Sequence, residues 1–508
     1  MDSSMQIFKG WPYAYQEVEH CWIRMTDGTR LSARLWLPES PKCEASPAVF
    51  EYIPYRKRDL HRARDEANHP FFAGHGYASV RVDMRGSGDS EGSITDMYTK
   101  AELNDAVEII EWIADQPWCD GRVGMMGTSW GGTSSLQAAS RRPESLKAVI
   151  AVCATNNRFE DDIHHMGGCL LTDSIQWGAH LPAILAAPPD PDVVGSNWRK
   201  LWLDRLEKIT SPLENWIEHE HRDDYWRWGS VNETPDAIQC PVLAVGGWVD
   251  RYSNTVLNLL AKSHTRCWGI VGPWRHEYPH LSAPGPVIDF QGEALRFWDR
   301  WLKDIDNGFD DEPRVRVWLQ SYDPPRDDQR QRSGHWIGES EWPCENVTPK
   351  VFYPSSGRLL AKACRDSESS QVPINLAVGL AAGDTGYMGR TGGLPLAQQE
   401  DDAFSLVFES EQLEAPLDLV GSAFLRADVD SDERVATLVL RLNDVPPQGD
   451  AARVTYAVRN LALDEAGTPT QSSNEPRRIS IEFPNTAYRF AAGHKIRLAI
   501  SSSYWPMI

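Results

Sequence analysis

The strongest chemical signal in the sequence is a serine held between glycines, in the run Gly127-Thr128-Ser129-Trp130-Gly131-Gly132. It matches the G-x-S-x-G pattern, with an apolar strand-like run (123–126) before it and a helical run of small residues (133–140) after it. A sharp turn from strand to helix needs small residues around the serine, and it exposes the hydroxyl beside a helix N-terminus. The pattern therefore predicts that Ser129 is a nucleophile.

A serine hydroxyl attacks a carbonyl effectively only when a base removes its proton. In this kind of site the acid and then the histidine follow the serine along the chain. Two later apolar runs, 242–245 and 268–271, are followed by Asp250 and His276. We predict that Asp250 fixes the imidazole tautomer, and that His276 deprotonates the serine and then protonates the leaving group.

Other titratable residues compete for these roles. His264 lies near the end of a predicted helix, which favours a surface position, and His280 follows the same strand as the predicted base. His164 and His165 are adjacent but have no nearby cysteine or third histidine, so no metal site is predicted. Asp83 also ends a strand, but it precedes the serine, which favours a structural role.

The tetrahedral intermediate needs hydrogen-bond donors for its oxyanion. The backbone N–H of Trp130 is the expected first donor. The second should come from the loop after the strand-like run 48–53, which reads Pro54-Tyr55-Arg56-Lys57-Arg58-Asp59. Because this loop has no glycine-rich stretch, Tyr55 could donate through its hydroxyl. A tyrosine that only packs in the loop explains the residue equally well.

Strand-like and helical patterns alternate through the N-terminal part of the chain, with a hairpin over 21–36 and a capping-box pair at Thr99 and Glu102. Such alternation predicts a mostly parallel sheet covered on both faces. The alternation stops over 154–238, a segment that has no strand-like run and is rich in tryptophan and charged residues. We predict a helical cap there. Beyond 312 apolar residues recur with period two, which is typical of an antiparallel β-sandwich.

These patterns divide the chain into an α/β catalytic domain (1–153 and 239–311), a helical cap (154–238) and a β-sandwich (312–508). The last eight residues follow a strong strand and end in Trp505-Pro506-Met507-Ile508. An apolar terminus directly after a core strand predicts that the sequence stops before the sandwich is complete, so that the chain is truncated.

Several motifs together resemble the superfamily of cocaine esterase, α-amino-acid ester hydrolase and X-prolyl dipeptidyl peptidase. The matching stretches are Pro54-Tyr55, Asp83-Met84-Arg85-Gly86-Ser87-Gly88-Asp89-Ser90-Glu91-Gly92, Gly127 to Gly132, Gly247-Trp248-Val249-Asp250 and Gly272-Pro273-Trp274-Arg275-His276. The resemblance implies an α/β-hydrolase fold with a helical cap insertion, followed by a C-terminal β-sandwich of the jelly-roll type. It also implies that the Tyr55 hydroxyl and the Trp130 N–H form the oxyanion hole.

We predict a serine hydrolase that cleaves an ester or amide through an acyl-enzyme on Ser129, a carboxylesterase or acylase. An X-prolyl dipeptidyl peptidase is the alternative, and a non-catalytic carbohydrate-binding protein is an alternative of another class. Glu160, Asp161 and Asp162 could bind a substrate amine, although a solvated acidic helix start is the explanation that we favour.

The charge and the cysteine content of the chain limit the kinds of partner that we expect. The net charge of −21 repels phosphate backbones and anionic lipid, so nucleic acid and membrane partners are not expected. The nine cysteines form no C-x-x-C pair, which indicates neither zinc nor a disulfide framework and favours reduced thiols in a cytoplasm. We expect no cofactor and no metal, and a small ester, amide or short peptide as substrate. The edges of a sandwich permit a homo-oligomer without requiring one.

Overall fold

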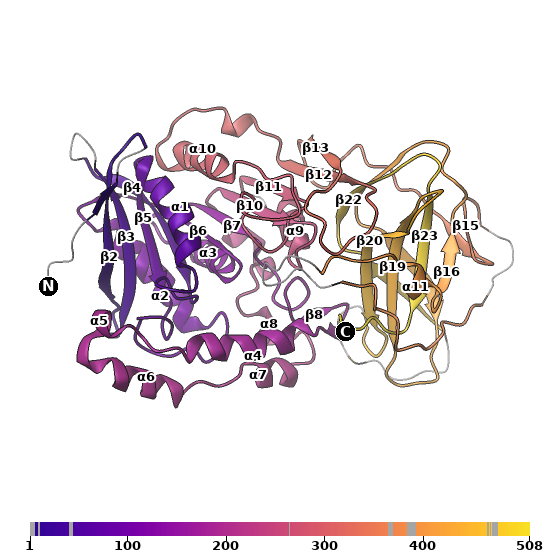
Figure 1. The fold of residues 1–508 in the computed structure, drawn as a ribbon, viewed down its shortest axis with the longest axis horizontal. Coiled ribbons are helices and arrows are strands. Elements are labelled where there is room, and N and C mark those ends of the chain that lie inside the picture. The colour runs from indigo at the N-terminus through magenta and orange to yellow at the C-terminus, as the bar shows by residue number, and fades with distance from the viewer. Residues whose placement is uncertain are drawn as a thin grey trace.

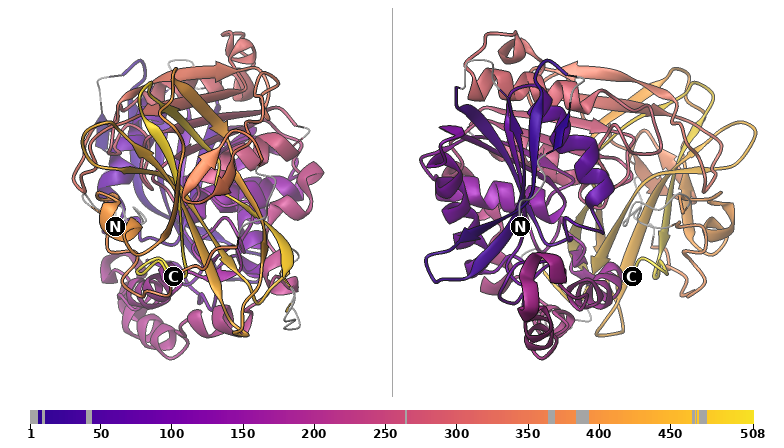
Figure 2. Two further views of the ribbon diagram at one scale, coloured as in Figure 1. Left: turned by 90° about the vertical axis from the view of Figure 1, so that its right-hand side faces the viewer. Right: turned by 60° about the vertical axis from the view of Figure 1, so that its left-hand side comes forward.

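The structure is a computed structural model that describes residues 6–8, 11–39, 44–263, 265–363, 369–383, 393–464, 467, 469 and 476–508. A sheet with helices, built from the N-terminal part, lies beside a β-rich body built from the C-terminal part (Figure 1). The helices of the segment 154–238, which interrupts the N-terminal part, run along one side of the molecule, and Figure 2 shows this arrangement from two further directions.

A central sheet is the framework of the N-terminal part. Its strands are, in spatial order, β1 (Gln6–Phe8), β2 (Tyr15–Arg24), β3 (Arg30–Pro38), β5 (Ala78–Asp83), β4 (Ser46–Ile53), β6 (Cys119–Thr128), β7 (Leu146–Val152), β10 (Val242–Gly247) and β11 (Cys267–Gly272). From β5 to β11 all neighbours are parallel. Every residue of β5, β10 and β11 is buried, because both faces of such a sheet are covered.

Helices cover the two faces and form two separate cores. On one face α2 (Lys100–Ala114), α3 (Trp130–Arg141) and α9 (Ser253–Lys262) share a core with the sheet. On the other, α1 (Arg62–Gly74) and α10 (Phe290–Leu302) do so. The predicted capping box is present, since Thr99 Oγ1 accepts from Glu102 N and Glu102 Oε2 accepts from Thr99 N, both at 3.3 Å. The mostly parallel sheet with helices on both faces confirms the prediction of an α/β-hydrolase fold.

The insertion is helical, as predicted, except for a small hairpin that the sequence pattern did not indicate. Its elements are β8 (His165–Met166), β9 (Cys169–Leu170), α4 (Asp173–Leu185), α5 (Pro191–Val194), η1 (Gly195–Asn197), α6 (Trp198–Leu206), α7 (Leu213–Glu218), α8 (Asp224–Arg227), η2 (Val231–Glu233) and η3 (Pro235–Ala237). The side chains of Trp177, Trp216 and Trp226 are buried in the same core as the sheet, which fixes the insertion onto it.

The C-terminal body is a β-sandwich. One sheet is β14 (Tyr353–Ser355), β15 (Arg358–Leu360), β16 (Leu406–Glu409), β23 (Lys495–Ser501), β19 (Thr437–Val445) and β20 (Ala452–Asn460). Facing it are β17 (Leu417–Gly421), β22 (Thr486–Phe490), β18 (Phe424–Val429) and β21 (Arg477–Glu482), with α11 (Gln399–Asp402) at one end. Alternating residues of both layers, such as Leu440 and Phe490, meet in one apolar core.

The strand β12 (Val315–Ser321) corrects one expectation. Its alternating Val315, Val317 and Leu319 predicted an antiparallel sandwich strand, but β12 pairs in parallel with β11 and continues the central sheet. It then pairs with β13 (Gly334–Glu339) and with β22 of the sandwich. The central sheet therefore continues past the predicted domain boundary at 311, which lies beside η4 (Phe309–Asp311). The domain limits stay a prediction.

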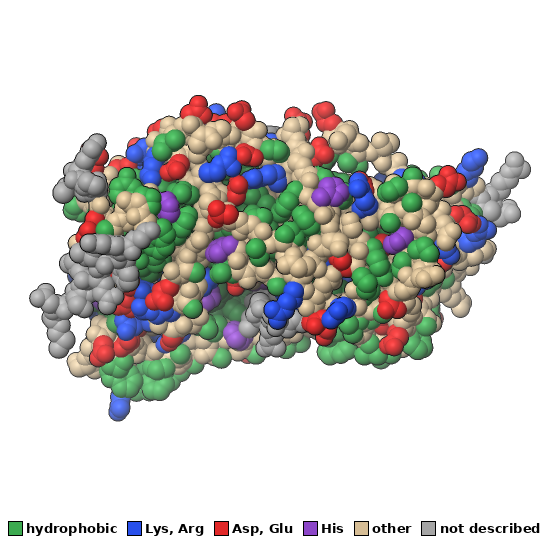
Figure 3. Space-filling model, turned by 45° about the horizontal axis from the view of Figure 1, so that its top comes forward, with side chains coloured by type: hydrophobic (Ala, Val, Ile, Leu, Met, Phe, Trp, Pro, Cys, Tyr) green, Lys and Arg blue, Asp and Glu red, His purple; other side chains and the backbone are tan. Residues whose placement is uncertain are grey.

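Charged side chains of both signs are intermingled on the face drawn in Figure 3. Within the described residues, no helix has the length and apolarity needed to cross a bilayer.

Candidate active site

Ser129 lies at a strained turn between β6 and α3. Its backbone has φ 61° and ψ −124°, a conformation that costs a non-glycine residue free energy and that is common at functional positions. Glycine is required next to it, because a Cβ at Gly127 would lie 2.5 Å from the backbone carbon of Gly131. The turn is the sharp strand-to-helix connection that the sequence pattern predicts.

Asp250 and His276 meet because the strands before them are neighbours. β10 and β11 run side by side, and their following loops are joined by hydrogen bonds from Trp248 N to Gly272 O and from Val249 N to Trp274 O. Gly247 permits this approach, since a Cβ there would lie 2.1 Å from Trp274 O.

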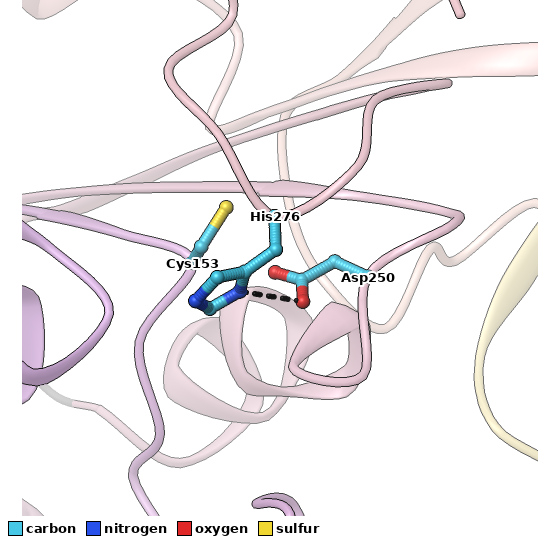
Figure 4. Close-up of side chains that lie close together, drawn as sticks. All are labelled: Cys153, Asp250 and His276. Atoms are coloured by element: carbon cyan, nitrogen blue, oxygen red, sulfur yellow. Dashed lines mark hydrogen bonds and ion pairs between the residues drawn. The ribbon is translucent and has the colours of Figure 1, made fainter. Parts of the chain in front are cut away.

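The His276 imidazole and the Asp250 carboxylate form a buried pair, with Nδ1 2.8 Å from Oδ1 (Figure 4). Burial lowers the pKa of His276, but the charge of Asp250 and its hydrogen bond outweigh this, so that the pKa lies above its ordinary value. An Nδ1–H that donates to Asp250 leaves Nε2 available to accept a proton.

One pocket of about 260 Å³ brings Ser129, His276 and Tyr55 together. Helix α4 of the insertion supplies part of its wall, which agrees with a cap that shapes the substrate site. The other lining residues are Leu60, His61, Arg64, Thr128, Trp177, His180, Ile184 and Glu277.

Tyr55 and Trp130, the predicted oxyanion donors, both lie beside Ser129. Burial raises the pKa of the Tyr55 phenol, so it stays protonated and can donate. The N–H of Trp130 belongs to the first turn of α3, where backbone donors have no partner within the helix. The packed-tyrosine interpretation is also met in part, because the Tyr55 ring lies edge-on to Trp177 with ring centroids 5.7 Å apart.

Comparisons with known proteins agree with this geometry. Residues 27–278 match the family described as X-Pro dipeptidyl-peptidase (S15 family), and residues 307–508 match the X-Pro dipeptidyl-peptidase C-terminal non-catalytic domain. The chain belongs to the S15 family of serine hydrolases. It is a hydrolase of ester or amide bonds, as the sequence predicts.

Relatives of this S15 hydrolase include esterases and peptidases. The cocaine esterase of Rhodococcus sp. strain MB1 Bresler is 25% identical over 97% of this chain and 92% of its own length. The Xaa-Pro dipeptidyl-peptidase of Lactobacillus delbrueckii subsp. lactis is 22% identical over 76% of this chain but only 49% of its own length.

Two solved structures share the fold of this hydrolase. An α-amino acid ester hydrolase has a TM-score of 0.76 at 20% identity, covering 100% of this chain and 92% of that one. A CocE/NonD family hydrolase from Staphylococcus aureus has a TM-score of 0.75 at 19% identity, covering 97% and 87%.

Sequence reasoning missed Cys153, which lies against the Asp250–His276 pair of the S15 hydrolase (Figure 4). The residue follows β7 with φ 47°, and its Sγ lies 3.9 Å from Arg275 O and 3.8 Å from Glu277 O. Burial raises the pKa of the thiol well above its usual range, so it is neutral. A single cysteine after a strand carries no sequence signal for such a position.

Two clusters have metal-ligand spacing among the described residues. One is Cys153 with Asp250 and His276, and the other is Glu51, Asp65 and His69. In the second cluster arginines already pair with the carboxylates: Arg64 lies 2.8 Å from Glu51 and Arg81 lies 3.1 Å from Asp65.

The three acidic residues suggested as amine ligands do not line the pocket with Ser129. Asp162 is fully buried and accepts from the Tyr252 hydroxyl at 2.9 Å. Asp161 accepts from Asn254 and Asn258. Glu160 is half-buried and accepts from Gly167 N at 2.9 Å. The alternative of a solvated helix start is wrong for Asp161 and Asp162, which are buried, whereas Glu160 keeps part of its surface exposed.

The competing residues have other surroundings. His280 stacks on Phe290 with ring centroids 5.8 Å apart. His164 and His165 are buried, which lowers the pKa of both, and they pack against Trp226. Asp83 accepts from Lys57 N at 2.9 Å, the structural role expected of it. His264 lies outside the described residues.

Proposed function

We propose that this hydrolase cleaves carboxylic esters, with Ser129 as nucleophile, His276 as base and Asp250 as the acid that orients it. The observation that carries the proposal is the Asp250–His276 hydrogen bond of 2.8 Å, next to a pocket that contains His276, Ser129 and Tyr55. A strained serine, a neutral imidazole nitrogen and a buried carboxylate are the parts that acyl transfer needs.

The reaction would proceed through an acyl-enzyme. His276 Nε2 takes the proton of Ser129 Oγ while Oγ attacks the carbonyl carbon, and the oxyanion accepts hydrogen bonds from the Tyr55 hydroxyl and the Trp130 N–H. The C–O bond to the leaving group then breaks, and His276 returns the proton to that oxygen. Water, deprotonated by His276, repeats the sequence and releases the acid.

Two features support an ester over an X-Pro peptide. The chain spans 92% of the cocaine esterase but only 49% of the lactobacillar Xaa-Pro dipeptidyl-peptidase. The pocket is small at about 260 Å³, and its Leu60, Trp177 and Ile184 offer apolar surface to an acyl group. The family acts on small esters or short peptides. Of these two substrate classes, we propose an acyl ester for this hydrolase.

A substrate panel tests this assignment. p-Nitrophenyl acetate, butyrate and benzoate are compared with alanyl-prolyl-p-nitroanilide, using wild type and Ser129→Ala. We expect turnover of the esters by wild type and none by the variant. Preference for the anilide would establish the dipeptidyl-peptidase alternative.

A fluorophosphonate probe separates both activities from a non-catalytic carbohydrate-binding protein. We expect labelling of wild type at Ser129 and no labelling of Ser129→Ala. An unlabelled wild type retained on polysaccharide would establish the binding protein instead.

We also propose a cytoplasmic location, because the seven cysteines that the structure describes are all free thiols. Fractionation of source cells, followed by alkylation of the protein, tests this. Recovery from the exported fraction would contradict it.

A further inference from the structure

A second and larger cavity lies between the hydrolase part and the sandwich. Its volume is about 600 Å³, against about 260 Å³ for the pocket with Ser129. The loop 248–254 after β10 forms one wall, the insertion contributes Glu160 and Met166, and strands β20, β21 and β22 form the wall opposite. The volume is in the range of small-molecule sites.

Arg332 brings a positive charge and an unpartnered donor to this cavity. Its Nε is buried and has no hydrogen-bond partner, and no ion pair joins it to a carboxylate among the residues that the structure describes. Burial lowers the pKa of Arg332, and the negative charge of Asp323 opposes this effect. A buried donor without an acceptor is costly, so the unpartnered Nε beside the cavity needs an explanation.

Arg453 adds a second guanidinium group that forms no ion pair in the described part of the chain. Its Nη1 donates to Ala382 O at 2.8 Å and to the Tyr504 hydroxyl at 2.6 Å, which are both neutral acceptors. By contrast, Arg251 on the same cavity has its counter-charge, since its Nη2 lies 2.7 Å from Asp173 Oδ2.

The carboxylates that border the cavity are held by other donors. Asp161 accepts from two asparagines, and Glu160 accepts from Gly167 N. Glu482 accepts from the Ser422 hydroxyl at 2.7 Å, and Asp250 is paired with His276. Neither Arg332 nor Arg453 forms an ion pair with these carboxylates in the described part of the chain, so both guanidinium groups have donors available to a ligand in the cavity.

We propose that this cavity is a second ligand site, which takes a small organic or inorganic anion through Arg332 and Arg453. Guanidinium groups present paired donors that match the oxygens of a carboxylate or a phosphate. Because the loop of Asp250 forms one wall, the occupant connects the hydrolase part to the sandwich. The site is separate from the pocket with Ser129 and does not depend on the proposed hydrolysis.

Titration calorimetry with succinate and, separately, inorganic phosphate tests the site, each against sodium chloride of equal ionic strength. We expect saturable one-site binding of at least one anion, with the same affinity in wild type and in Ser129→Ala. Arg332→Gln should weaken it about tenfold or more, because one charge-assisted hydrogen bond contributes at least that factor. Which anion binds identifies carboxylate or phosphate as the preferred group.

Arg326→Gln is the matched control, because Arg326 is exposed, pairs with Asp328 and does not line the cavity. It should bind as wild type does. If Arg332→Gln does not fold, Arg453→Gln and Arg332→Lys take its place, the latter with an intermediate affinity. Absence of saturable binding in wild type, equal affinity in the arginine variants, or loss of binding in Ser129→Ala would each overturn the proposal.

Discussion

Glu102 Oε1 accepts a hydrogen bond of 2.5 Å from the indole Nε1 of Trp130, the residue directly after Ser129. The same oxygen accepts from the Ser134 hydroxyl at 3.1 Å. One carboxyl group thus caps α2 through Thr99 and fixes the first turn of α3, from which the proposed oxyanion donor comes.

Glu102 should make stability depend on pH. Burial raises the pKa of Glu102 to about 7, so the folded state binds this proton more tightly than the unfolded state, where the ordinary value is 4.5. The contribution of this group is therefore greatest below pH 4.5 and is lost as the pH rises towards 7. The total change is about 3 kcal/mol. Urea unfolding of wild type and Glu102→Gln at several pH values measures it.

The difference in unfolding free energy between wild type and Glu102→Gln isolates the effect of Glu102. The other buried carboxyl groups contribute equally to the pH dependence of both proteins, so their contributions cancel in this difference. Their curves should converge or cross between pH 4.5 and 7, with wild type losing relative stability as the pH rises. Curves that stay parallel would show that Glu102 is ionised throughout this range.

Tyr55→Phe should lower kcat by about 10²- to 10³-fold with little change in KM, because it removes one donor to the oxyanion and keeps the ring. Ester turnover measures this. Tyr225→Phe is the control, since it also removes a partly buried hydroxyl, bonded to Asp96 at 2.8 Å, but one outside the pocket lining. Similar small losses in both variants would leave Tyr55 with a packing role only.

Asp250→Asn should lower kcat by about four orders of magnitude and shift the acidic limb of the pH profile. The base must be neutral, so kcat/KM rises as His276 loses its proton. Asp250 raises the pKa of His276 against the effect of burial, and without its charge the limb moves to lower pH. Glu277→Gln should produce a smaller shift in the same direction, because Glu277 also raises the pKa of His276. A profile in Asp250→Asn that moves to higher pH is incompatible with this pairing.

The sequence was sufficient to predict the positions of residues that follow strands of the parallel sheet. Ser129, Asp250 and His276 come within a few residues of the ends of β6, β10 and β11, and the carboxyl ends of parallel strands lie along one edge. Tyr55 follows β4 in the same way, so its position near Ser129 could be predicted.

Contacts between elements that are far apart in the sequence could not be predicted, because no local sequence pattern encodes them. The position of Cys153 beside Asp250 depends on the loops after β7 and β10, and the site of Trp177 depends on how α4 packs. The acidic run at Glu160 is typical of a solvated helix start, yet Asp161 and Asp162 are buried, and Asp161 accepts hydrogen bonds from two asparagines of α9. The alternation in β12 is that of any strand covered on one face, so it could not distinguish the end of the central sheet from the sandwich.

Cys153 should act as a positioning residue for Asp250. Its thiol is neutral and lies within 4.8 Å of the facing atoms of Asp250 and His276. Cys153→Ala removes a weak donor and leaves a small void there, so kcat should fall about tenfold with KM unchanged. Cys153→Ser keeps a donor of similar size and should restore most of the rate. The measurements are kcat and KM for a p-nitrophenyl ester, with the pH profile of each variant.

Cys267→Ala is the matched control, because Cys267 is also a buried thiol but begins β11, whereas His276 follows the end of that strand. Loss of a buried thiol alone would lower the stability of both alanine variants and leave their kcat unchanged. A purely structural Cys153 would therefore give equal kcat in Cys153→Ala, Cys153→Ser and Cys267→Ala. A loss of kcat confined to Cys153→Ala, with an altered acidic limb, requires that the thiol holds the carboxylate of Asp250 in place.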